Sequence, residues 1–272
     1  MNISSTSTTR RLHDLPGIRL LKRPYRWLKN YYTPEAVNVR KLRALRDRHR
    51  GRRGVVLGNG PSLRVEDLGR LGGDVTFASN KIFLAFPETS WRPTYYSVSD
   101  ILVAQNNLEE INTLRLAKIF GSSVKEVFPD RTDILWLRER NAPEQSFSED
   151  CAECVYGGFS VVYYQLQLAF HMGIREVYLI GMDFSFAVPT GTGQMSIHGE
   201  VIKSEGEVNH FHRDYRKPGE TWTMPRLDKQ QEAFACAKAA FERHGGVVYN
   251  ASRSTKLEVF PKVSFDTIFP GP

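Results

Sequence analysis

The sequence has few cysteines and lacks long apolar runs. Three cysteines in 272 residues are typical of a reducing compartment rather than of a disulfide-bonded scaffold. Cys151 and Cys154 form a CxxC pair with no second such pair, so we interpret them as ordinary reduced cysteines. No stretch approaches the roughly 18 apolar residues of a membrane span, and the opening MNISSTSTTRRLHDLPG lacks the apolar centre of a signal peptide. These absences predict a cytoplasmic protein.

Two common nucleotide-binding signatures are also missing. The glycine turn GNGPSL, residues 58–63, has Leu63 where the dinucleotide-binding pattern GxGxxG requires its third glycine. It also lacks the GK[ST] ending of a P-loop. A standard NAD or ATP fingerprint is therefore disfavoured, and any anion bound at this turn needs another identification.

From Gly54 onward the chain alternates short apolar runs with helical patterns. Leu227, Phe234 and Phe241 recur at seven-residue spacing and form one apolar helix face. Alternating βα units predict an α/β fold, with a Rossmann-like, mainly parallel sheet and helices on both faces, over residues 54–272. We expect strands at 55–57, 75–78, 94–98, 117–120, 176–180 and 246–249, and helices at 160–172 and 226–244.

Residues 1–53 form a basic N-terminal arm. They hold fifteen Lys and Arg against three acidic residues, a net charge of +12, and since the whole chain carries +7, residues 54–272 carry −5. The segment IRLLKRPYRWLKNYY interleaves basic and aromatic residues, which favours an anionic membrane surface contacted through residues 10–53. A helical extension packed on the domain or on another copy of the chain is the alternative, and a nucleic acid is not the expected partner. Pro24 and Pro34 exclude one long helix here.

A long segment without periodicity interrupts the domain at about 187–224. It contains five glycines, three histidines and several aromatic residues. Long loops inside compact domains are usually functional or disordered. Because the aromatic content argues against disorder, we expect this segment to be a lid over the active site.

The glycine turn itself is the first candidate site. A short buried strand precedes Gly58, Asn59 and Gly60, which tolerate positive φ and allow close approach to the backbone. Pro61 suits the start of a helix, and Ser62 is able to cap it. A strand, a glycine turn and a helix N-terminus together predict an anion site. The alternative is a tight turn without a ligand.

Polar residues follow the next two strands. Asn80 and Lys81 end the second strand, and Asp100 follows the third. Because carboxyl ends of parallel strands share one edge, these side chains are expected beside the glycine turn. Asn80 is able to bind a base or sugar and Lys81 a phosphate, although such residues are often simple turn formers.

A second anion site is expected where the helix at 160–172 begins. Gly157, Gly158 and the Ser160 hydroxyl would lie at its N-terminus. The strand after this helix delivers Asp183, a candidate for binding sugar hydroxyls. A helix cap or turn residue is the alternative interpretation of Asp183.

The segment NHFHRDY places His210 and His212 two residues apart. Alternate residues of an extended segment point the same way, so both imidazoles are predicted to face one site. A histidine is suited to act as general base toward a hydroxyl. The alternatives are a structural or substrate contact and a metal site with His198 and Asp183 as further ligands.

These motifs resemble a known bacterial family. The stretches GNGPSL, GGFSVVYYQLQLAFHMGIREVYLIGMDFSF, NHFHRDY and GGVVYNASRSTKLEVFPKV are similar to 6-hydroxymethylpterin diphosphokinase-like proteins of surface-polysaccharide and flagellin-glycosylation loci. GNGPSL, the SNK strand end and GIREVYLIGMDF also resemble, more distantly, bacterial sialyltransferases that use CMP-sialic acid without a metal. The likeness covers roughly residues 54–269 and leaves out the basic arm.

The second resemblance implies roles for several positions. Asn59 and Asn80 match nucleotide-binding asparagines, and the loop at 157–160 falls near the loop that holds the donor. Ser185 occupies the position of a phosphate-binding tyrosine. The catalytic histidine of that family lies just before the last helix, where this chain has methionine and proline, so His210 or His212 would take its role.

The resemblance implies a glycosyltransferase of bacterial surface-glycan synthesis. The expected donor is a nucleotide sugar, with a CMP-activated 2-keto acid such as sialic acid or Kdo as the leading candidate, and the acceptor is a glycan hydroxyl. No Asp-x-Asp triplet occurs, so we predict metal-independent transfer without a cofactor. The alternatives are a diphosphokinase that binds ATP and magnesium through Asp100 and Asp183, and a non-catalytic nucleotide- or glycan-binding protein.

Overall fold

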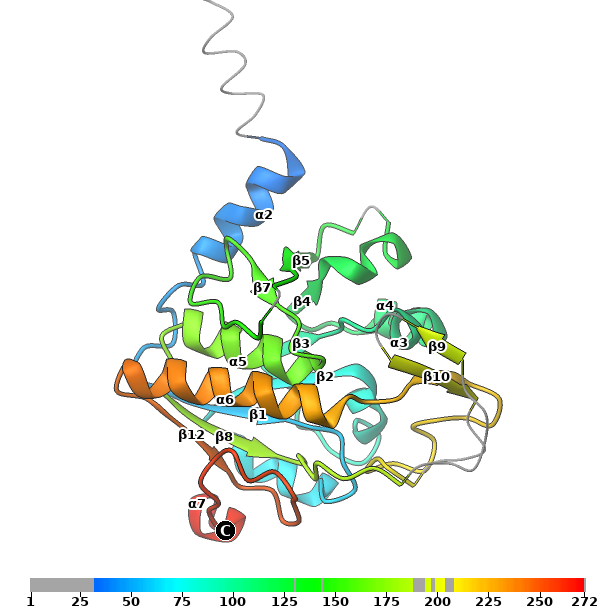
Figure 1. The fold of residues 1–272 in the computed structure, drawn as a ribbon, viewed down its shortest axis with the longest axis vertical. Helices are drawn as coiled ribbons and strands as arrows, with labels where there is room; N and C mark the ends of the chain where they lie inside the picture. Colours follow the sequence, from blue (N-terminus) through cyan, green and yellow to red (C-terminus); the bar gives the residue numbers. More distant parts are fainter. Residues whose placement is uncertain are drawn as a thin grey trace, which may run out of the picture.

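The computed structural model describes residues 32–129, 131–142, 144–187, 194–196, 199–203 and 208–271. Residues 1–31 of the basic arm and several residues of the expected lid lie outside this range. Figure 1 shows one central sheet, with the C-terminus at one end of the molecule and helix α2 (Pro34–Arg43) at the other.

The central sheet has seven strands, and every strand pair in it is parallel. Its interior strands are buried on both faces, which explains why they read as continuous apolar runs rather than as an alternating pattern. The predicted α/β class is confirmed. In sheet order the strands are β12 (Val247–Asn250), β8 (Glu176–Ile180), β1 (Arg53–Leu57), β2 (Val75–Ser79), β3 (Tyr95–Ser97), β4 (Lys118–Gly121) and β5 (Ile134–Leu137).

Six of these strands lie where the apolar runs predict them, and β5 was not predicted. Its sequence, ILWL, is a continuous apolar run like those of the predicted strands and follows a polar loop. β5 pairs only with β4 within this sheet. Its other edge is covered by α2, where Asn38 Nδ2 donates to Trp136 O and Trp136 N donates to Asn38 Oδ1, both at 2.8 Å. This contact protects an otherwise open sheet edge.

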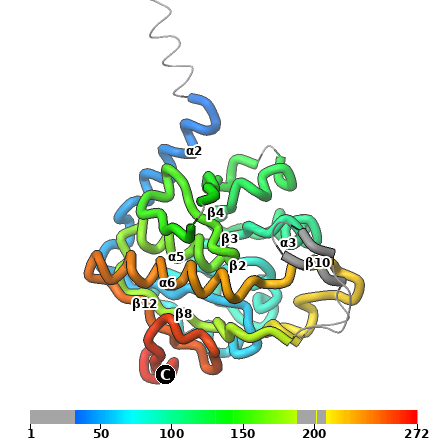
Figure 2. The backbone as a smooth tube through the Cα atoms, viewed as in Figure 1, coloured from blue at the N-terminus to red at the C-terminus, as the bar shows by residue number. Residues whose placement is uncertain are grey.

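Helices pack on both faces of the sheet. On one face α5 (Val161–His171) and α6 (Leu227–Arg243) lie side by side, as Figures 1 and 2 show, and bury the inward side chains of β1 and β2 such as Val56 and Phe77. The other face packs against Val55 and Leu57. It is covered by short helices: η2 (Val65–Leu71), η3 (Asn80–Ala85), α3 (Ile101–Asn106), α4 (Leu108–Thr113), η4 (Ser122–Val127) and α7 (Phe265–Ile268).

The second half of the arm packs on the domain. Helix α2 begins at Pro34 after Thr33, whose Oγ1 accepts a hydrogen bond from Ala36 N at 3.2 Å. Leu42 and Leu45 are buried in the same core as α5. This part of the arm is therefore a packed extension, and the division of the chain at residue 53 stays a prediction.

The expected lid contains a small antiparallel sheet. Its strands are β9 (Gln194–Ser196), β10 (Gly199–Lys203) and β11 (Thr221–Thr223). Asn106 Nδ2 at the end of α3 donates to Thr221 O at 3.3 Å and fixes β11 beside the central sheet. A two-stranded parallel pair, β6 (Glu139–Arg140) with β7 (Val155–Tyr156), lies on the way from β5 to α5.

Candidate functional site

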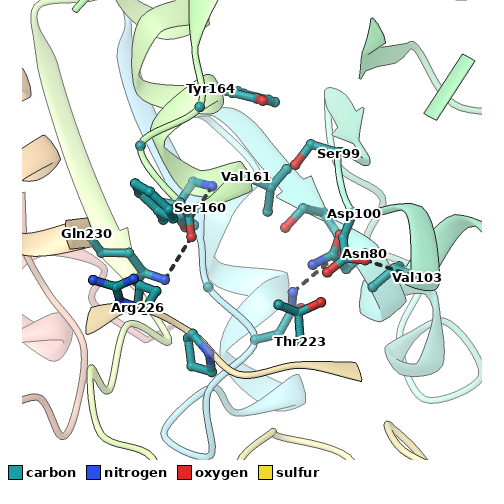
Figure 3. Close-up of a pocket in the computed structure, with 18 of the residues that line it drawn as sticks. Asn80, Ser99, Asp100, Val103, Ser160, Val161, Tyr164, Thr223, Arg226 and Gln230 are labelled. Atoms are coloured by element: carbon teal, nitrogen blue, oxygen red, sulfur yellow. Dashed lines mark hydrogen bonds between the residues drawn. The ribbon is translucent and has the colours of Figure 1, made fainter. Parts of the chain in front are cut away.

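A cavity of about 1000 Å³ lies at the carboxyl ends of β1, β2 and β8, between the central sheet and β11. In Figure 3, Ser160, Arg226 and Gln230 lie on one side of it and Asn80, Asp100 and Thr223 on the other. The structure brings most predicted site residues into this wall, and leaves out Ser62 and His212. The predicted residues that line it are Gly58, Asn59, Gly60, Asn80, Lys81, Asp100, Gly157, Gly158, Ser160, Asp183, Ser185 and His210.

The glycines of the GNGPSL turn leave room for the loop that follows β8, rather than for a ligand. None of residues 58–60 has a positive φ. Gly58 N donates to Ile180 O at 2.8 Å and Gly60 N donates to Gly181 O at 2.9 Å. A Cβ on Gly58 would collide with Gly181 O, and one on Gly60 would collide with the Asp183 carboxylate. The turn does not use this tolerance, and the close packing of the loop after β8 is what demands glycine at positions 58 and 60.

No α-helix follows this turn, so the predicted helix cap at Ser62 is wrong. The chain makes a turn and then the 3₁₀ segment η2. Ser62 Oγ donates to Asp183 Oδ2 at 2.8 Å, and Ser62 N donates to both Asp183 oxygens at 3.1 and 3.2 Å. The anion at this turn is therefore the protein's own carboxylate. Burial raises the pKa of Asp183, while its hydrogen bonds from Ser62 oppose that rise.

The ends of β1 and β2 present polar atoms without partners. Asn59 Nδ2 donates to Ser79 O at 3.2 Å, but within the described part of the chain Asn59 Oδ1, Ser79 Oγ and Asn80 Oδ1 are buried and make no hydrogen bond. Asn80 has a left-handed backbone, with φ of 51°, and its carbonyl accepts from Tyr96 OH at 2.6 Å. Unpaired buried polar atoms cost about 1–3 kcal/mol each, so this cluster is a candidate for ligand contact.

Lys81 is a buried cation in the cavity wall. It is 3% exposed, and its Nζ donates to Glu220 Oε1 at 2.6 Å. Glu220 also accepts from Lys217 N at 3.0 Å and from Asn106 Nδ2 at 3.3 Å. The carboxylate that neutralises Lys81 thus comes from the segment leading into β11, 139 residues along the chain.

Asp100 caps helix α3. Its Oδ1 accepts from Leu102 N at 2.8 Å and from Val103 N at 3.3 Å. This is the helix-capping role that polar strand-end residues often have. Asp100 still lines the cavity, but this capping occupies one of its carboxylate oxygens.

The start of α5 lines the cavity with Gly157, Gly158 and Ser160, and the predicted anion site there stays a prediction. Ser160 is the N-cap, and its Oγ accepts from Val162 N at 3.3 Å. Gly158 and Phe159 both have left-handed backbones, with φ of 54° and 56°. Phe159 is 42% exposed at the cavity wall, and Gln230 Nε2 holds its carbonyl at 2.9 Å. The sequence analysis missed Phe159, although an aromatic residue between a glycine pair and a helix cap is a recognisable signal.

The two histidines have different surroundings. His210 lines the cavity and stacks on Tyr215, with ring centroids 3.8 Å apart and planes at 4°. His212 lies outside the cavity wall, and its Nδ1 accepts from Asp214 N at 3.1 Å. The segment follows a series of bends rather than an extended strand, so alternate side chains do not share a face and the expectation that both face one site is wrong. Phe211 N donates to Asn59 O at 3.0 Å and fixes the segment on the glycine turn.

An aromatic wall faces the strand ends from the lid side. Trp222 on β11 is 7% exposed, and within the described residues its Nε1 has no hydrogen-bond partner. The Arg216 guanidinium lies 3.5 Å from the Trp222 ring centroid, and Phe186 packs against the same indole at 5.5 Å. Pattern reasoning did not single out these residues, because their cluster depends on where the lid folds back.

The described residues contain no group of three or more His, Cys, Asp and Glu side chains placed to hold a metal ion. The metal alternative included His198, which lies outside the described residues. Ser185 lies half-buried in the cavity wall. Among the helices described, none is long and apolar enough to cross a bilayer.

Comparison with known proteins assigns no family to this chain. No family model matches the chain, and no curated protein matches it. Among solved structures, the chain is similar to the MAf glycosyltransferase from Magnetospirillum magneticum AMB-1, with 14% identity and a TM-score of 0.48 over 85% of this chain and 38% of that chain. The chain thus spans well under half of that protein's length. The sequence resemblances named above stay predictions, and no site assignment rests on this likeness.

Proposed function

We propose that this chain is a glycosyltransferase that moves a sugar from a nucleotide donor to a glycan hydroxyl. The observation that carries the proposal is one cavity that joins polar strand ends, a helix N-terminus and a histidine. Its volume of about 1000 Å³ lies at the upper end of the roughly 300–1,000 Å³ typical of ligand pockets. A nucleotide sugar and part of an acceptor would fit such a space together.

The donor would lie along the carboxyl edge of the sheet. The N-terminus of α5 at Ser160 favours a negatively charged phosphate, whereas Lys81 in the same wall is already paired with Glu220. Asn59 and Asn80 would accept hydrogen bonds from ribose or base through their unpaired oxygens. A CMP-activated 2-keto acid is the donor that we propose, with its phosphate at the N-terminus of α5.

His210 is the residue that we propose as general base, since it lines the cavity while His212 does not. In transfer, the acceptor oxygen would bond to the anomeric carbon and pass its proton to His210. The bond from that carbon to the phosphate oxygen would break, and the nucleoside monophosphate would leave with the electron pair. Holding both substrates in one cavity lowers the entropic part of the barrier.

Nucleotide release by the purified protein in EDTA tests the proposal. The panel comprises CMP-sialic acid, CMP-Kdo, and UDP-, GDP- and dTDP-sugars with a mixed glycan acceptor. We expect CMP release from one donor, reduced about 10²–10⁴-fold by His210→Ala and little changed by the matched variant His212→Ala. Equal loss in both variants, or activity restored only by magnesium, would contradict the assignment.

Two further measurements separate the alternatives. AMP release from ATP with a pterin and magnesium, lost in Asp100→Asn, would favour the diphosphokinase. Calorimetric binding of CMP without turnover of any donor would favour a non-catalytic binding protein. In either case the cavity would remain the ligand site, and only the reaction assigned to it would change.

A further inference from the structure

A strongly basic surface lies at the end of the sheet opposite the cavity. Asp47 is the single acidic residue between positions 40 and 53. The exposed cations of this stretch run from the last turn of α2 to the start of β1. We call them the basic patch: Lys41, Arg43, Arg46, Arg48, Arg50 and Arg52.

Backbone hydrogen bonds fix this stretch at the amino ends of the strands. Asp47 N donates to His171 O at 3.0 Å and His49 N donates to Met172 O at 2.8 Å, at the C-terminal end of α5. The patch then leads directly into β1, whereas the cavity lies at the carboxyl end of that strand. In Figure 1 the blue stretch after α2 and the lid strands β9 and β10 lie at opposite ends of β1. Five residues of strand separate the two surfaces by about 17 Å.

Four of the six patch residues form no ion pair with a described residue. Arg46 pairs with Asp150, and Arg50 pairs with Asp47 at 2.9 Å. The four are Lys41, Arg43, Arg48 and Arg52, and the Arg52 guanidinium donates only to the backbone carbonyl of Gly73, at 2.8 Å. The pKa of His49 is lowered mainly by burial, with smaller contributions from the charges of Arg48 and Arg52.

The rest of the chain favours a lipid surface as the partner. Residues 54–272 carry −5, so an anionic surface would repel the body of the protein and attract this end. The adjoining sequence, IRLLKRPYRWLKNYY, interleaves aliphatic and aromatic residues with cations, and Tyr32 at its end is 67% exposed. Aromatic and aliphatic side chains gain by entering the headgroup region of a bilayer, while a nucleic-acid backbone offers them no such region.

We propose that the basic patch docks this protein on a bilayer containing anionic lipids, with the cavity turned away from the membrane. The cavity then stays open to soluble ligands while the protein is bound. A membrane-anchored acceptor must therefore present its reactive hydroxyl at a distance from the headgroups, as the far end of a glycan chain does. The docking itself does not depend on the proposed glycosyltransferase activity.

Vesicle co-sedimentation of the full chain tests the docking. Vesicles of phosphatidylcholine with phosphatidylglycerol are expected to bind the protein, and vesicles of phosphatidylcholine alone are not. The variant Lys41→Gln/Arg43→Gln/Arg48→Gln should bind about 100-fold more weakly, at roughly five-fold per charge lost. Circular dichroism checks that each variant is folded.

A control with the same change in net charge makes the test specific. Arg64, Lys125 and Lys217 are exposed cations outside the patch, and replacing all three by Gln should change binding only a few-fold. Equal losses in both triple variants would overturn the proposal, because binding would then follow net charge alone. Binding to a short RNA duplex but not to anionic vesicles would overturn it in favour of nucleic acid.

An environment-sensitive dye tests the orientation. A dye on Ala44→Cys, inside the patch, should shift its emission to the blue when anionic vesicles are added. A dye on Thr221→Cys, on β11 beside the cavity, should not shift. The reverse pattern would place the cavity against the membrane and overturn the orientation.

Discussion

The ion pair between Lys81 and Glu220 offers a test of how the segment with β11, part of the expected lid, is held on the central sheet. Lys81 Nζ lies 2.6 Å from Glu220 Oε1, with side-chain exposures of 4% and 13%. Glu220 Oε2 accepts from Lys217 N at 3.0 Å. Glu220→Gln removes the charge and leaves one acceptor oxygen for three donors, Lys81 Nζ, Asn106 Nδ2 and Lys217 N. Either Lys81 or the Lys217 amide therefore loses its hydrogen bond.

Removing one partner of a buried ion pair costs about 3–5 kcal/mol. The cavity beside Lys81 admits water, and the amide oxygen keeps one hydrogen bond, so we expect a loss of about 2–3 kcal/mol. This loss should appear first as lid opening, because the pair joins β11 to the sheet and local units open before the whole domain. At 1.4 kcal/mol per tenfold change, opening should become about 30–100 times more frequent.

Amide hydrogen exchange measures this opening directly. The amides of Thr221–Thr223 should exchange about 30–100 times faster in Glu220→Gln, while those of β2 stay unchanged. The matched control is Glu232→Gln, which breaks the exposed pair between Lys229 and Glu232, 2.8 Å apart on α6, and should cost less than about 1 kcal/mol. Unchanged exchange in β11 would refute the reasoning, because desolvation of the two charges would then cancel their attraction.

Three further predictions concern stability. Gly58→Ala should lower the free energy of unfolding in urea by about 1–3 kcal/mol, because its Cβ would meet Gly181 O. The control is Gly69→Ala, whose Cβ would meet nothing within 4 Å. Equal effects of the two substitutions would contradict the packing argument. Phe159→Gly should be about 1 kcal/mol more stable than Phe159→Ala, since only glycine adopts the left-handed backbone at position 159 without strain. Equal unfolding free energies of the two variants would mean that no strain is stored there. Hydrogen bonds from Arg253 and Arg70 lower the pKa of Asp266 to about 2. The stabilisation of the fold by the ionised Asp266 should therefore be present above pH 3.8 and vanish as the pH falls toward 2. Tm scans in which Asp266→Asn stays equally destabilised at pH 2 would disprove this.

Local sequence patterns were sufficient for the architecture. The apolar runs predicted six of the seven central strands, and the seven-residue spacing of Phe234 and Phe241 predicted the buried face of α6. These patterns work because burial on a sheet or a helix face repeats with the period of the backbone itself. β5 was missed although its sequence, ILWL, is an apolar run of the same kind.

The candidate site was predictable only in its outline. That strand ends would gather at one edge follows from parallel topology, and Asn59, Asn80 and Ser160 indeed line one cavity. Their detailed roles did not follow. The GNGPSL turn looked like an anion site, yet the loop after β8 fills it with Asp183.

The sequence by itself determined six of the central strands, the helices α5 and α6, and the uneven charge, because each of these depends on neighbouring residues or on composition. Only the tertiary structure decided which distant residues meet. It placed Glu220 on Lys81, left His210 rather than His212 in the cavity wall, and turned the basic patch to the end of the sheet opposite the cavity. Such contacts join segments far apart along the chain, and their geometry is set by the packing of the whole domain rather than by any local pattern.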